Sequence, residues 1–375
     1  MDVEVTVVGA GVVGCAVALA LARRGVSVIL LEAEPAPGFG ASGTNSGILH
    51  TGFDSPPGEL ETDLILRSAP LREPLLAELG LPLLPCGALL TPLEDSQRET
   101  VAALADNARV NGVVAVLRQD GSLEVPGEAV TDPVAFTLAL AAAAERHGAE
   151  LRREFRVSAI QRSGEELRVY GDSGVRVSCE VAVNCAGLAA DEVARLAGDD
   201  SFEVYPRKGE FLVFDPPEDE PLERILLPVP TKRTKGVLVF PTVDGKIAAG
   251  PTAVDGEDKG DWSVRPEASS EILPKAAAMY PPLGSAEPVA AYAGLRPAGR
   301  GVNYLIGPSA ACDGLINVAA IRSTGLTASL GIADHVCSLV ERQVVRLGDE
   351  QPLRPGPVEA APGPWWRRTA EHRAA

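Results

Sequence analysis

The sequence is poor in cysteine, histidine and lysine, and it carries few positive charges for its size. Its six cysteines are scattered without a CxxC pair, so neither a disulfide scaffold nor a structural zinc site is predicted, and reduced thiols are expected. The formal net charge of −17 argues against nucleic acid as a partner, because a phosphate backbone requires a basic face. Any anionic ligand must therefore be met by locally concentrated cations.

Long apolar segments are also missing. No run of about 20 uninterrupted apolar residues occurs, so no membrane span is predicted. The apolar N-terminus carries Asp2 and Glu4 where a signal peptide needs basic residues, and glycines interrupt it. We expect a cytoplasmic protein, with a peripheral place at a membrane as the alternative. A length of 375 residues predicts a large core and two domains.

The start of the chain has the pattern of a strand–helix–strand unit. Residues 3–11, VEVTVVGAG, are mostly β-branched and run into glycines, and residues 26–32, VSVILLE, form a second apolar run. Between them, residues 12–24 suit a helix that Gly25 ends. Such a unit implies a parallel sheet covered by helices.

A glycine motif follows the first strand of this unit, and an acidic residue ends the second strand. Gly9-Ala-Gly11-Val-Val-Gly14 follows the first strand, and Glu32 ends the second. Gly9 permits a tight turn, Gly11 lets a pyrophosphate approach the backbone, and Gly14 lets helix and strand pack closely. A carboxylate at the spacing of Glu32 accepts hydrogen bonds from a ribose. We predict dinucleotide binding, although the motif does not separate FAD from NAD.

The rest of the chain predicts further helices and strands and a proline-rich end. Helices are expected over 59–81 with breaks at Pro70 and Pro74, over 136–148 after an Asp132-Pro133 start, and over 326–345. Strands are expected at 151–160, 166–171 and 175–187 as an antiparallel meander, at 315–321, and through most of 201–300, with a hairpin at Asp244-Gly245. Beyond residue 346 we expect an extended arm outside the core. For its end, PWWRR, a subunit contact, a disordered end and a membrane anchor are the interpretations.

Residues 41–52, ASGTNSGILHTG, combine glycines and hydroxyls with His50, one of only four histidines. By composition alone this is an ordinary surface loop. It begins about ten residues after the second strand, however, and open α/β sheets bind ligands at the carboxyl ends of their strands. We therefore predict that the loop wraps a cofactor and brings His50 to the reacting edge.

Four segments in this order resemble the FAD-dependent oxidoreductases of the D-amino-acid-oxidase-like superfamily: GAGVVG with Glu32, TNSGILHTG, VNCAG and GLTAS. The similarity is closest to the branch of glycerol-3-phosphate oxidases and dehydrogenases and L-2-hydroxyglutarate oxidases, through NSGILH, RKGEFLVFD, PTKRTKGVLVFPTVDG and YAGLRP. It covers about residues 2–340. Two positions depart from the family pattern, because Ala320 stands where glycine is usual and Thr324 where proline is usual.

The resemblance implies an α/β fold, with a Rossmann-like FAD-binding domain of the glutathione-reductase type and a second, mainly antiparallel β substrate domain. The expected FAD-binding domain is discontinuous, over 1–80, 145–200 and 303–345. The expected substrate (cap) domain covers 81–144 and 201–302, and residues 346–375 form the proline-rich C-terminal tail.

The same resemblance implies non-covalent FAD in an extended conformation. Its pyrophosphate would lie on the glycine turn, its ribose on Glu32 and its adenine at the backbone of Val157. A helix start near Ser323 would face the flavin pyrimidine edge, where the helix dipole favours negative charge. The expected cofactor-binding residues are Gly9, Gly11, Val12, Val13, Gly14, Glu32, Ala33, Ser42, Thr44, Asn45, Ser46, Gly47, Leu49, Val157, Ala186, Gly187, Ser323, Thr324, Gly325, Leu326 and Thr327.

The expected catalytic residues are His50, Lys235 and Arg296. His50 would be the base that removes the hydroxyl proton while a hydride leaves carbon, a task that suits a neutral imidazole. A loop histidine with a single backbone hydrogen bond is the alternative. Lys235 and Arg296 flank apolar strands, where a charge needs a partner.

Further polar residues are expected to contact the substrate, namely Ser46, Arg322 and Ser323. Arginine can clamp a carboxylate or a phosphate with two hydrogen bonds. The cations of the middle region are either part of this anion site or solvated strand edges; they are Arg207, Lys208, Lys232 and Arg233. No metal site is predicted.

The expected function is FAD-dependent oxidation of a small anionic secondary alcohol, with glycerol 3-phosphate favoured because PTKRTKGVLVFPTVDG resembles that branch. L-2-hydroxyglutarate is the alternative substrate, and an amine or amino acid the next. Two other classes stay open: an NAD-dependent Rossmann dehydrogenase and a flavin-binding module without turnover. The electron acceptor would be O2, a quinone or an electron-transfer protein, and a homo-oligomer is compatible with this interpretation.

Overall fold

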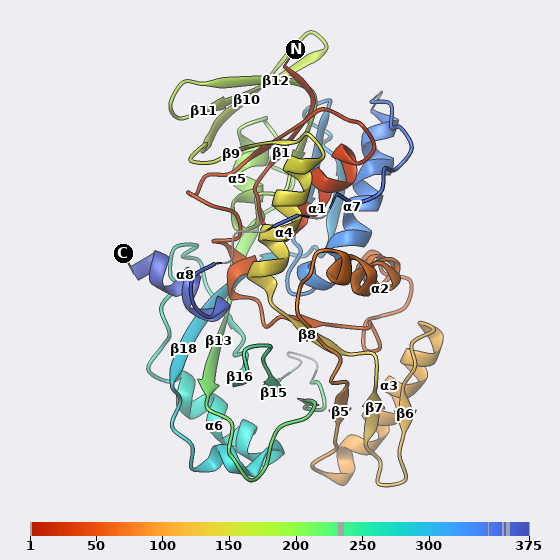
Figure 1. Cartoon of the computed structure of the whole chain (residues 1–375), viewed down its shortest axis with the longest axis vertical. Helices are drawn as coiled ribbons and strands as arrows, with labels where there is room; N and C mark the ends of the chain where they lie inside the picture. Colours follow the sequence, from red (N-terminus) through yellow and green to blue (C-terminus); the bar gives the residue numbers. More distant parts are fainter. Residues whose placement is uncertain (1, 232–235, 344, 355, 358–360, 375) are drawn as a thin grey trace.

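The computed structural model contains two large β-sheets that follow one another along the long axis of the molecule (Figure 1). It describes residues 2–231, 236–343, 345–354, 356–357 and 361–374. The first sheet has eight strands and the second has nine, and a small sheet of β3 (Ile48–Leu49), β8 (Ala129–Thr131) and β4 (Leu83–Leu84) accompanies them. The helices that carry the cofactor motifs surround the first sheet.

The first sheet is built on the strand–helix–strand unit predicted from the start of the chain. β1 (Val3–Val8) pairs in parallel with β2 (Val28–Leu31) on one side and with β12 (Arg176–Asn184) on the other. β9 (Glu150–Arg152) adds to β2, and β20 (Leu315–Ala319) adds to β12, again in parallel. Helices cover both faces of such a sheet, so its strands are apolar on both sides. The predicted parallel sheet is confirmed.

An antiparallel meander completes this sheet. β10 (Val157–Ser163), β11 (Glu166–Gly171) and β12 pair in succession, as predicted, and β19 (Leu305–Pro308) pairs antiparallel with β20. The expected single strand over 151–160 is wrong, because the chain turns at Glu154, whose φ is 54°. Its first half is β9 of the parallel part and its second half is β10.

Four long helices pack against one another beside the first sheet. α1 (Val12–Ala22) packs against α4 (Pro133–Arg146) and against α7 (Gly325–Arg342), and α2 (Leu60–Glu78) packs on α7. The predicted start of α4 is confirmed, since the Asp132 carboxylate accepts the N–H groups of Val134 and Ala135 at 2.8 and 2.9 Å. The short helix α5 (Ala190–Arg195) follows β12 and contacts β20.

The predicted breaks at Pro70 and Pro74 are wrong, because α2 runs through both prolines. Both prolines are exposed, so the carbonyl groups that lose their helical hydrogen bonds can bind water. The opposite face of α2 buries Leu64, Ile65 and Leu76. Burial of that face against α7 outweighs the local cost of the prolines.

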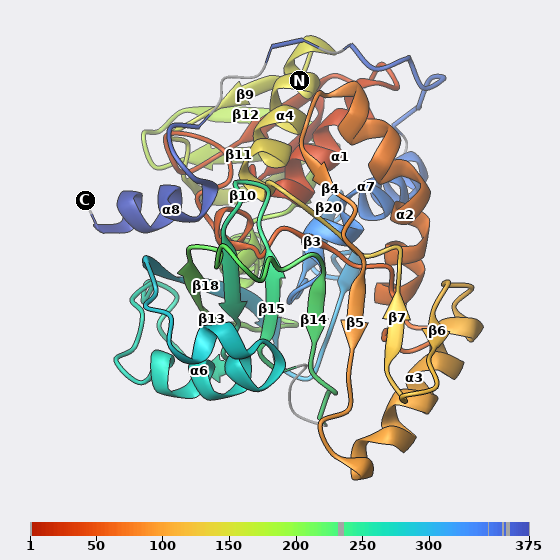
Figure 2. The same ribbon diagram turned by 60° about the horizontal axis from the view of Figure 1, so that its bottom comes forward.

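The second sheet is long and mostly antiparallel, and Figure 2 shows several of its strands side by side. Its two longest strands, β13 (Val204–Phe214) and β18 (Ala290–Gly299), pair at one end of the sheet. The other edge of β13 pairs with β16 (Ile247–Gly250) and β17 (Val254–Asp255). The order continues through β15 (Leu238–Pro241), β14 (Ile225–Leu227), β5 (Ala88–Leu90), β7 (Leu123–Val125) and β6 (Val116–Leu117). The predicted hairpin at Asp244-Gly245 is confirmed, because it joins β15 to β16 with Gly245 at a φ of 78°.

Two helices of this half were not predicted. α6 (Ala268–Met279) buries Ala268, Ile272 and Ala276 at a spacing of four residues, and α3 (Arg98–Val110) buries Val101 and Ala108. Pro274 lies inside α6 and interrupts the pattern that would have identified it. The described part of the chain contains no helix that is both long and apolar enough to cross a lipid bilayer.

The predicted extended arm at the C-terminus is wrong in its last part. Residues 365–374 form the helix α8 (Trp365–Ala374), which lies at the flank of the molecule beside both sheets (Figure 1). Trp365 and Trp366 are buried, and the Trp365 ring meets the Tyr292 ring edge to face, with the centroids 5.6 Å apart. Two adjacent tryptophans supply enough apolar area to fix a short helix that would not be stable alone.

Ala320, one of the two residues that depart from the family pattern, has a strained backbone conformation. Ala320, directly after β20, has a φ of 56°, in the left-handed region that costs a residue with a Cβ roughly 1–2 kcal/mol. Ala320 is buried and lines the main cavity. A glycine, which the resemblance leads one to expect here, would adopt this conformation without that cost.

We therefore expect Ala320→Gly to stabilise the protein by about 0.5–1 kcal/mol, since relief of the strain exceeds the chain entropy that glycine loses. Thermal unfolding with FAD in excess should show a rise in Tm of about 2 °C. Ala319→Gly, one residue earlier in β20, is the control and should lower the Tm. An equal fall for both variants would contradict the strain at Ala320.

Candidate active site

A cavity of about 1590 Å³ lies between the two sheets and is lined by both of them. On the side of the first sheet, it is lined by the glycine turn after β1, the loop after β2, the end of β12 and the start of α7. β13 and β18 contribute from the second half. The volume exceeds the roughly 300–1,000 Å³ typical of small-molecule pockets, so an extended dinucleotide and a small substrate can both be accommodated.

The glycine turn is tightly packed, and Gly9 and Gly14 are required by close contacts. Gly9 has a φ of 100°, and a Cβ there would lie 2.6 Å from the Cys185 carbonyl oxygen. A Cβ on Gly14 would lie 1.9 Å from the Gly9 carbonyl oxygen. The first position thus needs the backbone freedom of glycine, and the last lets α1 approach β1 closely. The bare turn leaves the N-terminus of α1 open toward the cavity.

The loop after β2 closes over that helix start. The 3-10 turn η1 (Ala41–Thr44) places Ser42 so that its hydroxyl accepts the Val12 N–H at 2.9 Å. Asn45 holds the next bend, because its side-chain oxygen accepts the Gly47 N–H at 2.9 Å. Hydroxyls and backbone N–H groups at a helix start form a typical phosphate site.

Glu32, the residue predicted to bind a ribose, is held by backbone N–H groups at the cavity wall. Its carboxylate accepts the Ala10 N–H at 2.7 Å and the Glu34 N–H at 2.9 Å. Burial raises the pKa of this carboxyl, although these backbone hydrogen bonds oppose the shift. Each carboxylate oxygen keeps acceptor capacity for a hydroxyl group, and Glu32 lines the cavity.

Most of the residues that the sequence predicted to bind the cofactor line this one cavity. They are Gly9, Gly11, Val12, Val13, Glu32, Ala33, Ser42, Thr44, Asn45, Ser46, Val157, Ala186, Gly187, Ser323, Thr324, Gly325 and Leu326. Among the described residues, the remaining four, Gly14, Gly47, Leu49 and Thr327, lie behind its wall. Thr327 supports the loop, because its hydroxyl accepts the His50 N–H at 3.1 Å and donates to the Ile48 carbonyl at 3.3 Å.

The start of α7 faces the cavity with its unpaired N–H groups. Thr324 occupies the N-cap position without a side-chain capping bond. Its hydroxyl donates instead to Glu61 at 2.6 Å and lies 2.7 Å from the Tyr304 hydroxyl. The proline that is usual in the family could make neither contact. An anionic edge of a ligand is stabilised here by the helix dipole.

His50 lines the cavity and is held by a buried carboxylate. Its Nδ1 lies 2.9 Å from Glu128 Oε2, and the Glu128 side chain is fully buried. The other Glu128 oxygen accepts the Thr51 N–H at 2.6 Å and the Thr51 hydroxyl at 2.9 Å. Since the carboxylate is an acceptor, Nδ1 carries the proton, and Nε2 is left with a lone pair for a ligand.

A buried arginine completes this arrangement. Arg72 of α2 donates to the His50 carbonyl oxygen at 2.8 Å. Burial lowers the pKa of Arg72 to about 10, and the nearby negative charge of Glu128 opposes the shift. The backbone of His50 is therefore fixed by Arg72 and Thr327, and its ring by Glu128.

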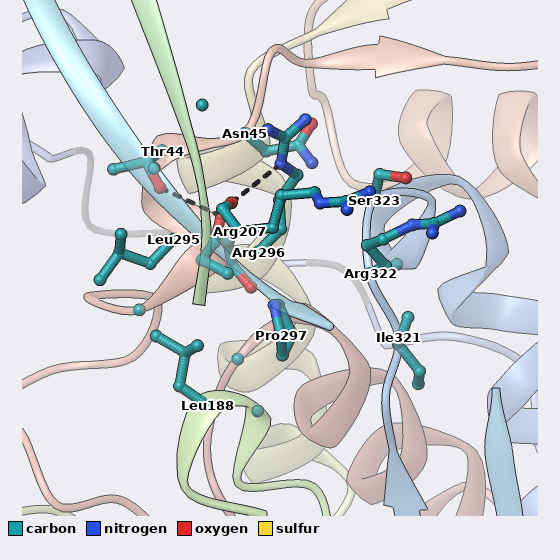
Figure 3. Close-up of a pocket in the computed structure, with 18 of the residues that line it drawn as sticks. Thr44, Asn45, Leu188, Arg207, Leu295, Arg296, Pro297, Ile321, Arg322 and Ser323 are labelled. Atoms are coloured by element: carbon teal, nitrogen blue, oxygen red, sulfur yellow. Dashed lines mark hydrogen bonds between the residues drawn. The ribbon is translucent and has the colours of Figure 1, made fainter. Parts of the chain in front are cut away.

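Three arginines form the cationic side of the cavity, with Asn45 and Ser323 beside them (Figure 3). Arg207 of β13 and Arg296 of β18 are directly paired in the sheet register. Burial, followed by the positive charges of Arg207 and Arg322, lowers the pKa of Arg296 to about 10. Mutually repelling cations in one pocket favour an anionic ligand.

Arg296 itself is bonded only to neutral groups within the described residues. Its guanidinium donates to the carbonyl oxygens of Arg207, Lys208 and Thr252 at 3.1, 3.0 and 2.7 Å. Arg207 differs, because it pairs with Asp255 at 2.8 Å. The positive charge of Arg296 is thus met by backbone carbonyls and by no direct carboxylate contact among the described residues.

The other predicted cations have mixed outcomes. Lys208 is buried and pairs with Asp261 at 2.6 Å, so it holds a loop to the sheet and does not line the cavity. Lys232, Arg233 and Lys235 lie outside the described residues. Ser46, Arg322 and Ser323 line the cavity with Arg296, as expected for substrate-binding residues, but their roles stay a prediction.

Sequence reasoning missed Glu128 and Arg72. Glu128 is the only charged residue in the run VPGEAVT, and a lone charge between apolar residues is a signal of a buried, paired group. Its partner lies 78 positions earlier, so only the fold reveals the pair. Arg72 sits on a helix that looked interrupted by proline, which hid the face it shares with Leu76 and Leu64.

The arrangement fits FAD by its own geometry. Gly9 and Gly14 leave no room for a Cβ, the hydroxyl loop and a helix start offer donors to phosphates, and the half-buried Glu32 carboxylate is the acceptor predicted for a ribose. A second helix start, that of α7, also lines the cavity, close to α1. Two such termini suit a cofactor with a pyrophosphate and an additional electron-rich ring.

Comparison with known proteins agrees with this fit. Residues 4–339 match the family model of FAD dependent oxidoreductases (DAO). A glycerol 3-phosphate dehydrogenase of Caloramator mitchellensis is 28% identical over 368 residues, which cover 94% of this chain and 76% of the relative. A mitochondrial L-2-hydroxyglutarate dehydrogenase of Mus musculus is 27% identical over 277 residues, covering 66% and 60%.

A solved structure is similar over nearly the whole chain. It is the dithionite-reduced L-α-glycerophosphate oxidase of Mycoplasma pneumoniae with FAD bound, with a TM-score of 0.87 and 25% identity, covering 95% of this chain and 99% of the other. The chain therefore belongs to the DAO family of FAD dependent oxidoreductases, and FAD is its cofactor.

Proposed function

We propose that this protein oxidises glycerol 3-phosphate at its secondary alcohol to dihydroxyacetone phosphate, and that His50 is the base. The observation that carries the proposal is the meeting of two groups in the FAD cavity. One is an imidazole whose Nδ1 is held by a buried carboxylate, and the other is a cluster of arginines around Arg296. An alcohol with an anionic end needs both.

The protein's part in the reaction follows from these contacts. Bound FAD supplies the two-electron acceptor for the hydride that leaves the carbinol carbon. His50 takes the hydroxyl proton on Nε2, so that the O–H and C–H bonds are replaced by a C=O bond. Glu128 holds the ring in the tautomer that can accept this proton and stabilises the resulting positive charge.

The arginines bind and orient the anionic end of the substrate. Arg296 has a positive charge that no carboxylate contacts among the described residues, and Arg322 and Ser323 lie at the start of α7 on the same cavity. A phosphate dianion gains more from several cations than a single carboxylate does. Lys235, which lies outside the described residues, is proposed to complete this site.

L-2-hydroxyglutarate is the second candidate substrate. Its support is the L-2-hydroxyglutarate dehydrogenase relative, which matches 66% of this chain, against 94% for the glycerol 3-phosphate dehydrogenase. Both substrates place a secondary alcohol beside an anionic group, so the same His50 and arginine arrangement serves either. The more complete match favours glycerol 3-phosphate.

The first prediction concerns the substrate. Purified protein with FAD, mixed anaerobically with glycerol 3-phosphate, should lose its visible flavin absorption as electrons enter the flavin. L-2-hydroxyglutarate should bleach it more slowly, and glycine or proline should leave it unchanged. Bleaching by L-2-hydroxyglutarate alone would shift the assignment to that acid, and bleaching by an amino acid alone would refute alcohol oxidation.

The second prediction concerns the His50–Glu128 pair. His50→Asn should lower kcat by about 10²–10⁴, the usual range for loss of a general base. Glu128→Gln should also lower kcat by at least tenfold, because an amide can stabilise the wrong tautomer and lacks the negative charge. In both variants the KM for the substrate and the flavin content should change little. Rapid anaerobic mixing measures the bleaching rate directly.

Asp199→Asn is the matched control for Glu128→Gln. Asp199 is also a buried carboxylate, which accepts hydrogen bonds from Ser309 and Asn317 at 2.6 and 2.9 Å, but it does not line the cavity. Its replacement should reduce stability and leave the bleaching rate nearly unchanged. Equal losses of rate in the two variants would mean that Glu128 acts only through the fold.

The third prediction concerns the placement of Arg296 by Gly209. A Cβ at Gly209 would lie 2.9 Å from the Arg296 Nη2 atom and 2.9 Å from the Pro251 Cβ, so Gly209→Ala must displace the guanidinium, the Pro251 ring or both. Loss of the Arg296 contact with the substrate anion should raise the KM about 10- to 100-fold, as expected for a hydrogen bond to a charged group, with a smaller effect on kcat. Gly307→Ala, where a Cβ meets nothing within 4 Å, is the control. An unchanged KM in Gly209→Ala would remove Arg296 from the substrate site.

A further inference from the structure

The C-terminal helix α8 contacts the loop after β2, which lines the cavity beside the glycine turn. Thr369 is fully buried against this loop, since a Cβ on Gly43 would lie 2.3 Å from its hydroxyl oxygen. The Arg368 guanidinium lies over the Phe39 ring, 3.8 Å from the centroid, and donates to the Pro37 carbonyl at 2.9 Å. One face of α8 therefore covers the stretch between β2 and the turn η1.

The last turn of α8 binds Glu34, which lies beside the ribose-binding carboxylate. His372 Nε2 and Arg373 Nη2 each lie 2.9 Å from one of the two Glu34 carboxylate oxygens. The His372 ring also stacks on Phe39, with the centroids 4.0 Å apart. The backbone N–H of Glu34 is itself bound to Glu32 at 2.9 Å. A short chain of hydrogen bonds thus leads from α8 to the group that meets the ribose.

Arg373 is also part of the cavity wall. Its guanidinium lies 5.3 Å from the centroid of the Trp262 ring, which lines the cavity from the second half of the molecule, and it donates to the Phe39 carbonyl at 3.3 Å. The other end of α8 is attached to the second sheet, because the Trp366 indole N–H donates to Asp244 at 3.1 Å. The helix α8 therefore contacts both the second sheet and the segment of residues 34–50, here called the cofactor loop.

We propose that α8 is part of the FAD site and acts as a clasp that retains the adenosine diphosphate end of FAD. The proposal rests on FAD as cofactor and is independent of the substrate. Glu34, Gly38, Gly40 and Ala41 line the cavity on one side of the loop, and α8 packs on the other. When α8 is docked, the loop cannot move outward to release the cofactor. FAD dissociation therefore requires the contacts with Glu34 and Phe39 to break.

A further prediction tests the clasp by FAD binding. In His372→Ala/Arg373→Ala, which removes both bonds to Glu34, the Kd of the apoprotein for FAD should rise about tenfold, the effect expected from losing two charge-assisted hydrogen bonds and a stacking contact. Glu34→Gln, on the other side of the contact, should raise it by a smaller factor.

Arg367→Ala is the matched control. It removes an arginine from the same helix, but the Arg367 guanidinium lies over the Trp366 ring, 5.1 Å from its centroid, and is exposed. Its Kd for FAD should match the unmodified protein. All three tryptophans of the chain, Trp262, Trp365 and Trp366, lie at this junction, so protein fluorescence follows both the docking of α8 and the arrival of FAD during the titration.

Limited trypsin digestion gives a second measurement. If α8 had only a structural role, FAD would not change the rate at which trypsin cleaves it. FAD should slow cleavage after Arg367 and Arg368 and should leave cleavage after Arg109, on the exposed end of α3, unaffected. Equal Kd values in the double variant and in Arg367→Ala, or equal cleavage of α8 with and without FAD, would overturn the clasp. Neither result bears on the choice of substrate.

Discussion

The close approach of β18 to the cofactor loop is the contact on which the active site depends. A Cβ on Gly294 would lie 2.7 Å from the Thr44 hydroxyl oxygen and 3.0 Å from its carbonyl oxygen. Only a residue without a side chain lets the second sheet come this near to η1. Arg296 follows two positions later on the same face of the strand, so this approach sets how far the cationic end of the cavity lies from the flavin site.

The charge of the cavity is opposite in sign to the net charge of the protein. The chain is strongly acidic, yet the cavity collects Arg207, Arg296 and Arg322. The cost of burying Arg296 is visible in its lowered pKa, and backbone carbonyls compensate part of it without neutralising the charge. A pocket that keeps a positive charge inside an anionic protein attracts small anions while it disfavours large ones, because the outer surface repels extended polyanions.

Local patterns explain why part of the fold and site could be predicted from the sequence. The strand–helix–strand unit, the glycine turn, Glu32, the Asp132 cap and the hairpin at Gly245 depend on neighbours within about 30 residues, and their physical signals are short-ranged. The continuity of α2 through Pro70 and Pro74 depends instead on its packing against α7. Glu128 and α8 act on residues far away in the chain, and no local pattern could have indicated their partners.

The cofactor loop shows how these long-range contacts combine. Its beginning is held by α8 through Glu34 and Phe39, and its end is held at His50 by Thr327, Arg72 and Glu128. A segment so rich in glycine and serine has a large conformational entropy when free. Anchors at both ends reduce that entropy before the cofactor binds, so less of the FAD binding energy is needed to order the loop. Because coupling between sites is reciprocal, FAD must in turn stabilise both anchors, including the histidine that we assign as the base.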